Sequence, residues 1–315
     1  MAKSAQNGDA NRDAREAATL LAKQTPDNPK QPGHTSRLLT WDEIAEWQQD
    51  NYYIVTGYRA ASWSYLKSLA SLGYLHNESV NIYTHGLGAF FYSGLGYVVY
   101  HNLKGRYATA SIGDVLATGC FFAGAFLCMG MSSTFHLIMN HSPRVQDFGN
   151  ALDYLGIVCL IAGSYVPNVY YGFYCDPVLQ WSYWGLMGAV GLGCAVVSVR
   201  PEFRTPKWRT FRACMFVGMG LSSVGSVIHG CLKYGASQFN RQMRYEWMIY
   251  EGIQYTLGAA LYAARVPERF APGKFDIWGS SHQIFHVLVL TAAGTHLAGV
   301  IKAFDYCHQY VRCAG

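Results

Sequence analysis

Seven stretches without charged residues alternate with polar segments from residue 79 onwards. They are Ser79–Leu103, Val115–Pro143, Tyr154–Cys175, Pro177–Val199, Ala213–Leu232, Gly252–Ala264 and Ile277–Ile301. A transmembrane helix needs about 20 mostly apolar residues, and six of the stretches reach that length. The exception, Gly252–Ala264, is short and must include Tyr245–Glu251, which brings Glu246 and Glu251 with it. The pattern predicts an all-α integral membrane protein with a bundle of seven transmembrane helices.

The residues before the first stretch differ in character from the rest of the chain. Residues 1–39 are polar, interrupted by prolines and without apolar periodicity, which predicts a disordered tail. Residues 40–78 are expected to form a cytosolic amphipathic juxtamembrane segment. In this segment Thr40 and Glu43 have the spacing of a helix capping box, and Ile44 and Trp47 form an apolar stripe. The membrane domain is then expected over 79–302, with a short outer tail over 303–315.

Composition agrees with a membrane protein embedded in a lipid bilayer. The chain is 51% hydrophobic and only 14% charged, against about 25% charged residues in an average soluble domain. Nine cysteines are scattered without a Cys-x-x-Cys pair, which predicts buried free thiols rather than disulfides or a zinc ribbon. The net charge of +5 is spread along the loops, so we expect no nucleic-acid partner.

The distribution of lysine and arginine predicts the orientation of the bundle. Near the helix ends, 11 of these residues fall on the side of the amino terminus and 7 on the opposite side. The densest block runs from Arg200 to Arg212. Because positive residues are enriched in cytoplasmic loops, the amino terminus is expected in the cytosol and the carboxyl terminus outside.

Polar residues at the ends of several apolar stretches point to a shared site. His282 and His286 open the last stretch, and their spacing of four places both on one helical face. Hydrogen bonds from the two histidines to neighbouring helices would explain this pair as well as a shared metal ion would. However, His136 lies near the end of the second predicted helix and Asp153 at the start of the third. The end of an even helix and the starts of two odd ones lie on the same membrane face, just inside the cytosolic leaflet.

Three imidazoles with an open fourth position are the ligand set of a catalytic zinc site. The sequence therefore predicts Zn²⁺ held by His136, His282 and His286. Asp153 would bind the reactive water and accept its proton, and Ser132, one turn before His136, would hydrogen-bond the water or a substrate carbonyl. Asp153 could instead cap the helix, although an ionisable group at membrane depth favours a functional role. For Ser132, a purely packing role remains an equal alternative.

Three other polar residues lie in or beside the apolar stretches and are not assigned to the site. His85 occupies a lone helical position and is expected to form a hydrogen bond to a neighbouring helix. His296 lies ten residues beyond His286, too far along the helix axis to join the cluster. The sequence leaves open whether Glu251 faces a polar cavity or lies at the outer interface.

Several longer motifs resemble those of the progestin and adipoQ receptors, a family that includes adiponectin receptors and haemolysin-III-related membrane proteins. The resemblance runs from about Trp41 to Gly299. Its motifs include Asp50-Asn51-x-Tyr53-Ile54, Glu78-Ser79-x-Asn81-Ile82-Tyr83-Thr84-His85, Ser132-x-x-x-His136, Leu152-Asp153-Tyr154-x-Gly156-Ile157, Pro267-Glu268-Arg269-Phe270-x-Pro272-Gly273-Lys274 and Ser281-His282-Gln283-Ile284-Phe285-His286.

The resemblance implies seven helices with a cytosolic amino terminus, a zinc ion on residues matching His136, His282 and His286, and a water-linked Asp153. It also implies a receptor-like role with zinc-dependent hydrolysis of a lipid amide, so that the membrane lipid partner is ceramide or a free fatty acid. The chain looks most like fungal members, which the resemblance ties to lipid and zinc homeostasis. The expected location is the plasma membrane or the endoplasmic reticulum, and an extracellular ligand stays unidentified.

Two classes of function remain open from the sequence. The first is a ceramidase-like amide hydrolase that uses the zinc ion in catalysis. The second is a receptor in which zinc is purely structural and nothing is hydrolysed. A transporter ranks third, because matching broken helices in the two halves of the chain are not evident.

Overall fold

The structure, a computed structural model, describes residues 37–313. The tail predicted over 1–39 therefore lies almost wholly outside the described residues. Within the described residues the secondary structure is helical, and the one β-bridge recorded there joins Leu39 and Tyr58.

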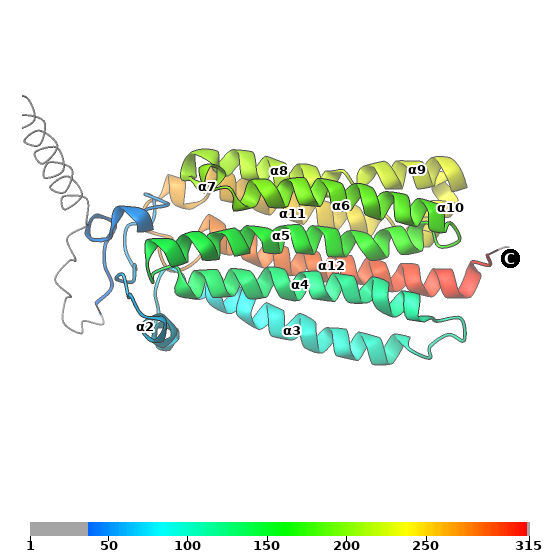
Figure 1. Cartoon of the computed structure of the whole chain (residues 1–315), viewed down its shortest axis with the longest axis horizontal. Coiled ribbons are helices and arrows are strands. Elements are labelled where there is room, and N and C mark those ends of the chain that lie inside the picture. The colour runs from blue at the N-terminus through cyan, green and yellow to red at the C-terminus, as the bar shows by residue number, and fades with distance from the viewer. Residues whose placement is uncertain (1–36, 314–315) are drawn as a thin grey trace, which may run out of the picture. The chain divides into compact units, whose positions relative to one another are not determined.

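The helices follow one another with short connections, and the long ones lie side by side (Figure 1). In chain order they are η1 (Trp41–Glu43), η2 (Glu46–Gln48), α2 (Tyr65–Ala70), η3 (Ser71–Gly73), α3 (Ser79–Leu103), α4 (Ile112–Ile138), α5 (Pro143–Gly172), α6 (Pro177–Val199), α7 (Pro201–Arg204), η4 (Pro206–Trp208), α8 (Arg209–Leu221), α9 (Val224–Tyr234), α10 (Ala236–Met243), α11 (Glu246–Ala264), η5 (Glu268–Phe270) and α12 (Ser281–Tyr310).

Five helical segments are long and apolar enough, by length and composition, to cross a membrane. They are Ile112–Ile138, Pro143–Gly172, Pro177–Val199, Pro206–Tyr234 and Ser281–Tyr310. The fourth combines η4, α8 and α9. Together they support the prediction of an all-helical, multi-pass membrane protein.

Several helix boundaries differ from those predicted. α5 begins at Pro143, well before the predicted stretch that starts at Tyr154. Its first turns contain the charged residues Arg144 and Asp147, which interrupt a charge-free stretch but do not interrupt the helix. Asp153 therefore lies inside α5, and the alternative that it caps this helix is wrong. α12 continues to Tyr310, beyond the predicted domain boundary at 302.

Two further segments are less regular than predicted. The fifth predicted helix is interrupted between α8 and α9, where the hydroxyls of Ser222 and Ser223 donate to the carbonyl oxygens of Met219 and Gly220 at 2.6 and 2.7 Å. At Thr40 the capping box forms, since the backbone N–H of Thr40 donates to the Glu43 carboxylate at 3.0 Å. It caps only the single turn of η1 and not a longer amphipathic helix.

The prediction of free thiols is wrong for two of the nine cysteines. Cys175 and Cys313 form a disulfide across 138 residues of sequence, and the other seven cysteines are free thiols. Cys175 follows the end of α5 and Cys313 follows the end of α12, so the two meet at one end of the bundle. Their distance along the chain concealed the pairing, because no local spacing rule connects them.

Candidate metal centre

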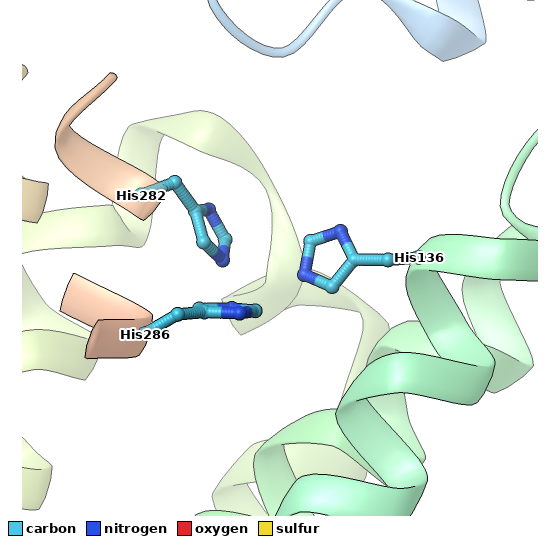
Figure 2. A group of neighbouring side chains, drawn as sticks. All are labelled: His136, His282 and His286. Atoms are coloured by element: carbon cyan, nitrogen blue, oxygen red, sulfur yellow. The ribbon is translucent and has the colours of Figure 1, made fainter. Parts of the chain in front are cut away.

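Two helices bring the three predicted histidines together. The last turn of α4 supplies His136, and the first two turns of α12 supply His282 and His286 (Figure 2). One nitrogen atom from each ring lies within 4.8 Å of those of the other two. His136 and His286 are 2% and 1% exposed, and His282 is half-buried.

The three imidazoles fit a metal ion. Neutral imidazole nitrogen is a preferred zinc ligand, and three such ligands leave one position open. Nε2 of His136 is buried and, within the described part of the chain, has no hydrogen-bond partner. Buried polar atoms normally have partners, so this nitrogen is available to bind a ligand. The group could therefore hold a metal ion.

Glu78 contacts the group but was not among the site residues predicted from the sequence. Its Oε2 atom lies 2.7 Å from Nδ1 of His136 and accepts a second hydrogen bond, also of 2.7 Å, from the side-chain amide of Asn81. Carboxylates commonly orient metal-binding histidines in this way. Glu78 directly precedes α3, the first long helix. Because the starts of odd helices lie on the same membrane face as His136, the position of Glu78 at the start of the first long helix was a signal in the sequence for its place near the group.

Arg59 fixes the end of α4. It is 4% exposed and donates to the carbonyl oxygens of His136 and Leu137 at 2.6 and 2.8 Å. Burial lowers the pKa of Arg59 to about 10, against an opposing effect of Glu78, so the guanidinium remains charged at neutral pH. A cation near the last carbonyl groups stabilises a helix terminus and here holds the turn that carries His136.

Glu268 fixes the start of α12. It is fully buried, and its carboxylate accepts from the backbone N–H of Ser281 at 2.8 Å, from the Ser281 hydroxyl, and from Asn51 at 3.1 Å. The first turn of a helix has unpaired N–H groups that favour a negative partner. The turn carrying His282 is thereby tied to the juxtamembrane segment.

Asp153 and Ser132 lie next to the three histidines but are not part of that group. Asp153 is 8% exposed and lines a cavity of about 420 Å³ together with His136 and His282. The Ser132 side chain is 2% exposed and interacts with the Asp153 carboxyl group. The cavity wall continues through polar residues of the loops and helix starts: Glu46, Gln49, Asp50, Asn51, Gln146, Asp147, Arg204, Thr205 and Asp276. The cavity therefore connects two of the three histidines with the polar loops.

The remaining intramembrane residues take other positions. His85 does not form the expected hydrogen bond: within the described chain both its ring nitrogens lack partners. It stacks on His286 instead, with ring centroids 3.6 Å apart. Glu251, whose environment the sequence left open, lies 3.0 Å from Nδ1 of His296, and this pair is separate from the three-histidine group.

A model of the family described as haemolysin-III related matches residues 73–297. The ADIPOR-like receptor IZH2 of Saccharomyces cerevisiae is 41% identical over 272 residues, which cover 86% of each chain. The adiponectin receptor protein of Drosophila melanogaster is 38% identical over 277 residues, or 88% of this chain and 62% of that relative. Heptahelical transmembrane protein 1 of Arabidopsis thaliana is 34% identical over 281 residues, covering 88% of this chain and 83% of the relative.

Proposed function

This chain belongs to the haemolysin-III-related family, and with that membership as premise we propose that it is a zinc-dependent hydrolase of a membrane lipid amide of the ceramide type. We place this activity in lipid and zinc homeostasis signalling, at the plasma membrane or the endoplasmic reticulum. The observation that carries the proposal is the convergence of His136, His282 and His286 beside a cavity whose wall contains Asp153.

The proposed membrane domain has seven spans, with α3 and α11 completing the five apolar segments. The lengths of α3 and α11, 25 and 19 residues, suit a bilayer crossing. Their exposed side chains are largely apolar, as a lipid-facing surface requires: Leu87, Phe90 and Phe91 on α3, and Ile249, Ile253 and Leu257 on α11. The Arabidopsis relative is called a heptahelical protein, which agrees with this number.

We orient the amino terminus and the metal centre toward the cytosol. The bias of lysine and arginine supports this orientation, and the disulfide supports it independently. Cys175 and Cys313 lie at the end of α5 opposite to the end near His136. Disulfides persist mainly in oxidising compartments, which favours an outside location for that end. Residues 40–78 would then form a cytosolic segment over the cavity mouth.

His136, His282 and His286 are the proposed ligands. A zinc ion held there would supply Lewis acidity, which makes water a competent nucleophile near neutral pH. Asp153, buried in the cavity wall, would accept the proton of the attacking water and return it to the departing amine. Ser132 would hold the Asp153 carboxylate or donate to the substrate carbonyl.

A receptor with a purely structural metal is the second candidate. The names of two relatives favour it, since IZH2 and the Drosophila protein are both called receptors. In that case the metal would tie α4 to α12, and a ligand would act by shifting these helices.

Replacement of Asp153 by Asn separates the two functions. Asn keeps the shape and a hydrogen-bonding oxygen but cannot accept a proton, so turnover of labelled ceramide should fall about 10²–10⁴-fold while bound zinc is retained. The assay uses purified protein with and without a chelator. Turnover that is unchanged in Asp153→Asn would remove the hydrolytic mechanism and leave the receptor function ahead.

A further inference from the structure

Glu78 and the first two turns of α3 supply no ligand to the three-histidine group, yet they contact two of its members. Glu78, directly before α3, contacts Nδ1 of His136 at 2.7 Å. Thr84, in the second turn, contacts Nδ1 of His286 at 3.4 Å. His282 packs instead against the ring of Tyr262, with centroids 5.0 Å apart.

We propose, on the basis of the proposed metal site, that α3 is a positioning element that selects the tautomers of two metal ligands. Glu78 and Thr84 hold the ring proton of His136 and His286 on Nδ1. Each ring then presents the lone pair of Nε2 to one shared metal ion. Glu78 and Thr84 are positioning residues, since they act through the histidines.

The tautomer of His136 follows from hydrogen-bond chemistry. An ionised carboxylate only accepts hydrogen bonds. The Oε2 atom of Glu78 accepts one from Asn81 at 2.7 Å, and it is the same oxygen that contacts His136, so the proton between them belongs to Nδ1. Nε2 of His136 is then an acceptor, and it is this atom that is buried without a partner in residues 37–313.

The hydrogen bond between Thr84 and His286 is weaker, but the imidazole is again the donor. The Thr84 hydroxyl donates its own proton to the carbonyl oxygen of Val80 at 2.7 Å, which leaves its lone pairs to accept from His286. At 3.4 Å this bond is long, so Thr84 should contribute less than Glu78. His85 adds to the orientation because its ring stacks on His286 with an angle of 8° between the planes.

The spacing of these residues accounts for the motif from Glu78 to His85, to which the hydrolytic mechanism assigns no role. Glu78, Asn81 and His85 recur at intervals of three and four, and Thr84 lies three residues after Asn81, so these residues lie toward one side of the start of the helix. That side is directed at α4 and α12, where the ligands lie. Partners of this kind typically change metal affinity 10–100-fold when removed.

The test is the zinc affinity of the purified full-length protein in detergent, measured by competition with a chromophoric chelator. Glu78→Ala should raise the Kd for zinc about 10–100-fold. Glu78→Gln should raise it less, because the amide oxygen still accepts a hydrogen bond but carries no charge. Thr84→Val should raise it by less than about tenfold, and Thr84→Ser should restore it. The absorption bands of cobalt in the same variants report ligand geometry and should shift with Glu78→Gln.

Glu251→Ala is the matched control. It removes an equivalent carboxylate–imidazole contact, of 3.0 Å to His296, about 15 Å along α12 from His286. Zinc affinity should therefore stay at the wild-type value. If Glu78→Ala does not fold, the isosteric Glu78→Gln and Thr84→Val decide the question.

The outcomes separate the positioning role from the proposed function. Wild-type zinc affinity in Glu78→Gln and Thr84→Val, or an equal loss in Glu251→Ala, would overturn the positioning role while leaving the metal site intact. A wild-type protein that binds no zinc would overturn the metal site itself. The predicted order of affinities without any ceramide turnover would support positioning and contradict only the hydrolase.

Discussion

His76, in the juxtamembrane segment, is fully buried and held in its neutral form. Its Nδ1 atom accepts a hydrogen bond of 3.1 Å from the backbone of Glu78, the residue that contacts His136. Burial, followed by the nearby charge of Arg59, lowers the pKa of His76 to about 3. The folded protein therefore keeps this imidazole uncharged at a pH where an unfolded chain would protonate it.

The low pKa of His76 predicts a loss of stability in mild acid. The contribution of neutral His76 to the free energy of unfolding is fully present above the unfolded pKa of about 6.5. It is lost as the pH falls from 6.5 toward 3. At pH 5.5 the loss should be about 1.4 kcal/mol. His76→Asn supplies an acceptor that does not titrate, so its stability should change less between pH 7.5 and 5.5. Unfolding in detergent at both pH values measures this, and identical pH dependence in the two proteins would contradict it.

At the scale of the helices, α4 and α5 approach closely through glycines. A Cβ atom on Gly163 would lie 2.5 Å from the carbonyl oxygen of Cys120, and one on Gly124 would lie 2.6 Å from that of Cys159. Small residues permit such close backbone contact between membrane helices. This contact fixes the distance between the helix carrying His136 and the helix carrying Asp153.

Gly163→Ala should force α4 and α5 apart, because the added methyl group meets backbone that cannot rotate away. We expect a loss of stability of about 1–3 kcal/mol and lower zinc occupancy. Gly130→Ala is the control on α4, since a Cβ atom there meets nothing within 4 Å and alanine favours helix by up to about 1 kcal/mol. Equal melting temperatures for the two variants would argue against the tight contact.

Helix positions were predictable to the extent that charge marks a boundary. The stretches Ser79–Leu103 and Pro177–Val199 coincide with α3 and α6, because polar loops adjoin them directly. α5 and α12 extend past their stretches, since charged residues at membrane interfaces continue a helix. The convergence of the three histidines followed from helix order alone. Glu78 was missed because it was treated as the edge of a stretch, and the stacking of His85 depends on packing that no local pattern encodes.

At the scale of the whole molecule, the two ends of the proposed bundle differ in chemistry. The end with the histidines carries the positively charged segment from Arg200 to Arg212, and the other end carries the disulfide of Cys175 and Cys313. A tag inserted near Thr205 should be inaccessible to antibody in intact cells, because positive loops stay in the cytosol. A tag after Gly315 should be accessible. The reverse labelling would contradict the proposed orientation.

The three histidines come from α4 and α12, so metal occupancy of this group tests the central proposal most directly. Elemental analysis should find about one zinc ion per purified wild-type chain, because three imidazoles form the site. His286→Ala leaves two protein ligands and should lose most of the zinc, together with stability that metal binding contributes. His229→Ala is the control, since His229 bonds Tyr183 at 2.8 Å and should leave the zinc content unchanged. Full zinc occupancy in His286→Ala would contradict the assignment of the three histidines as the metal site.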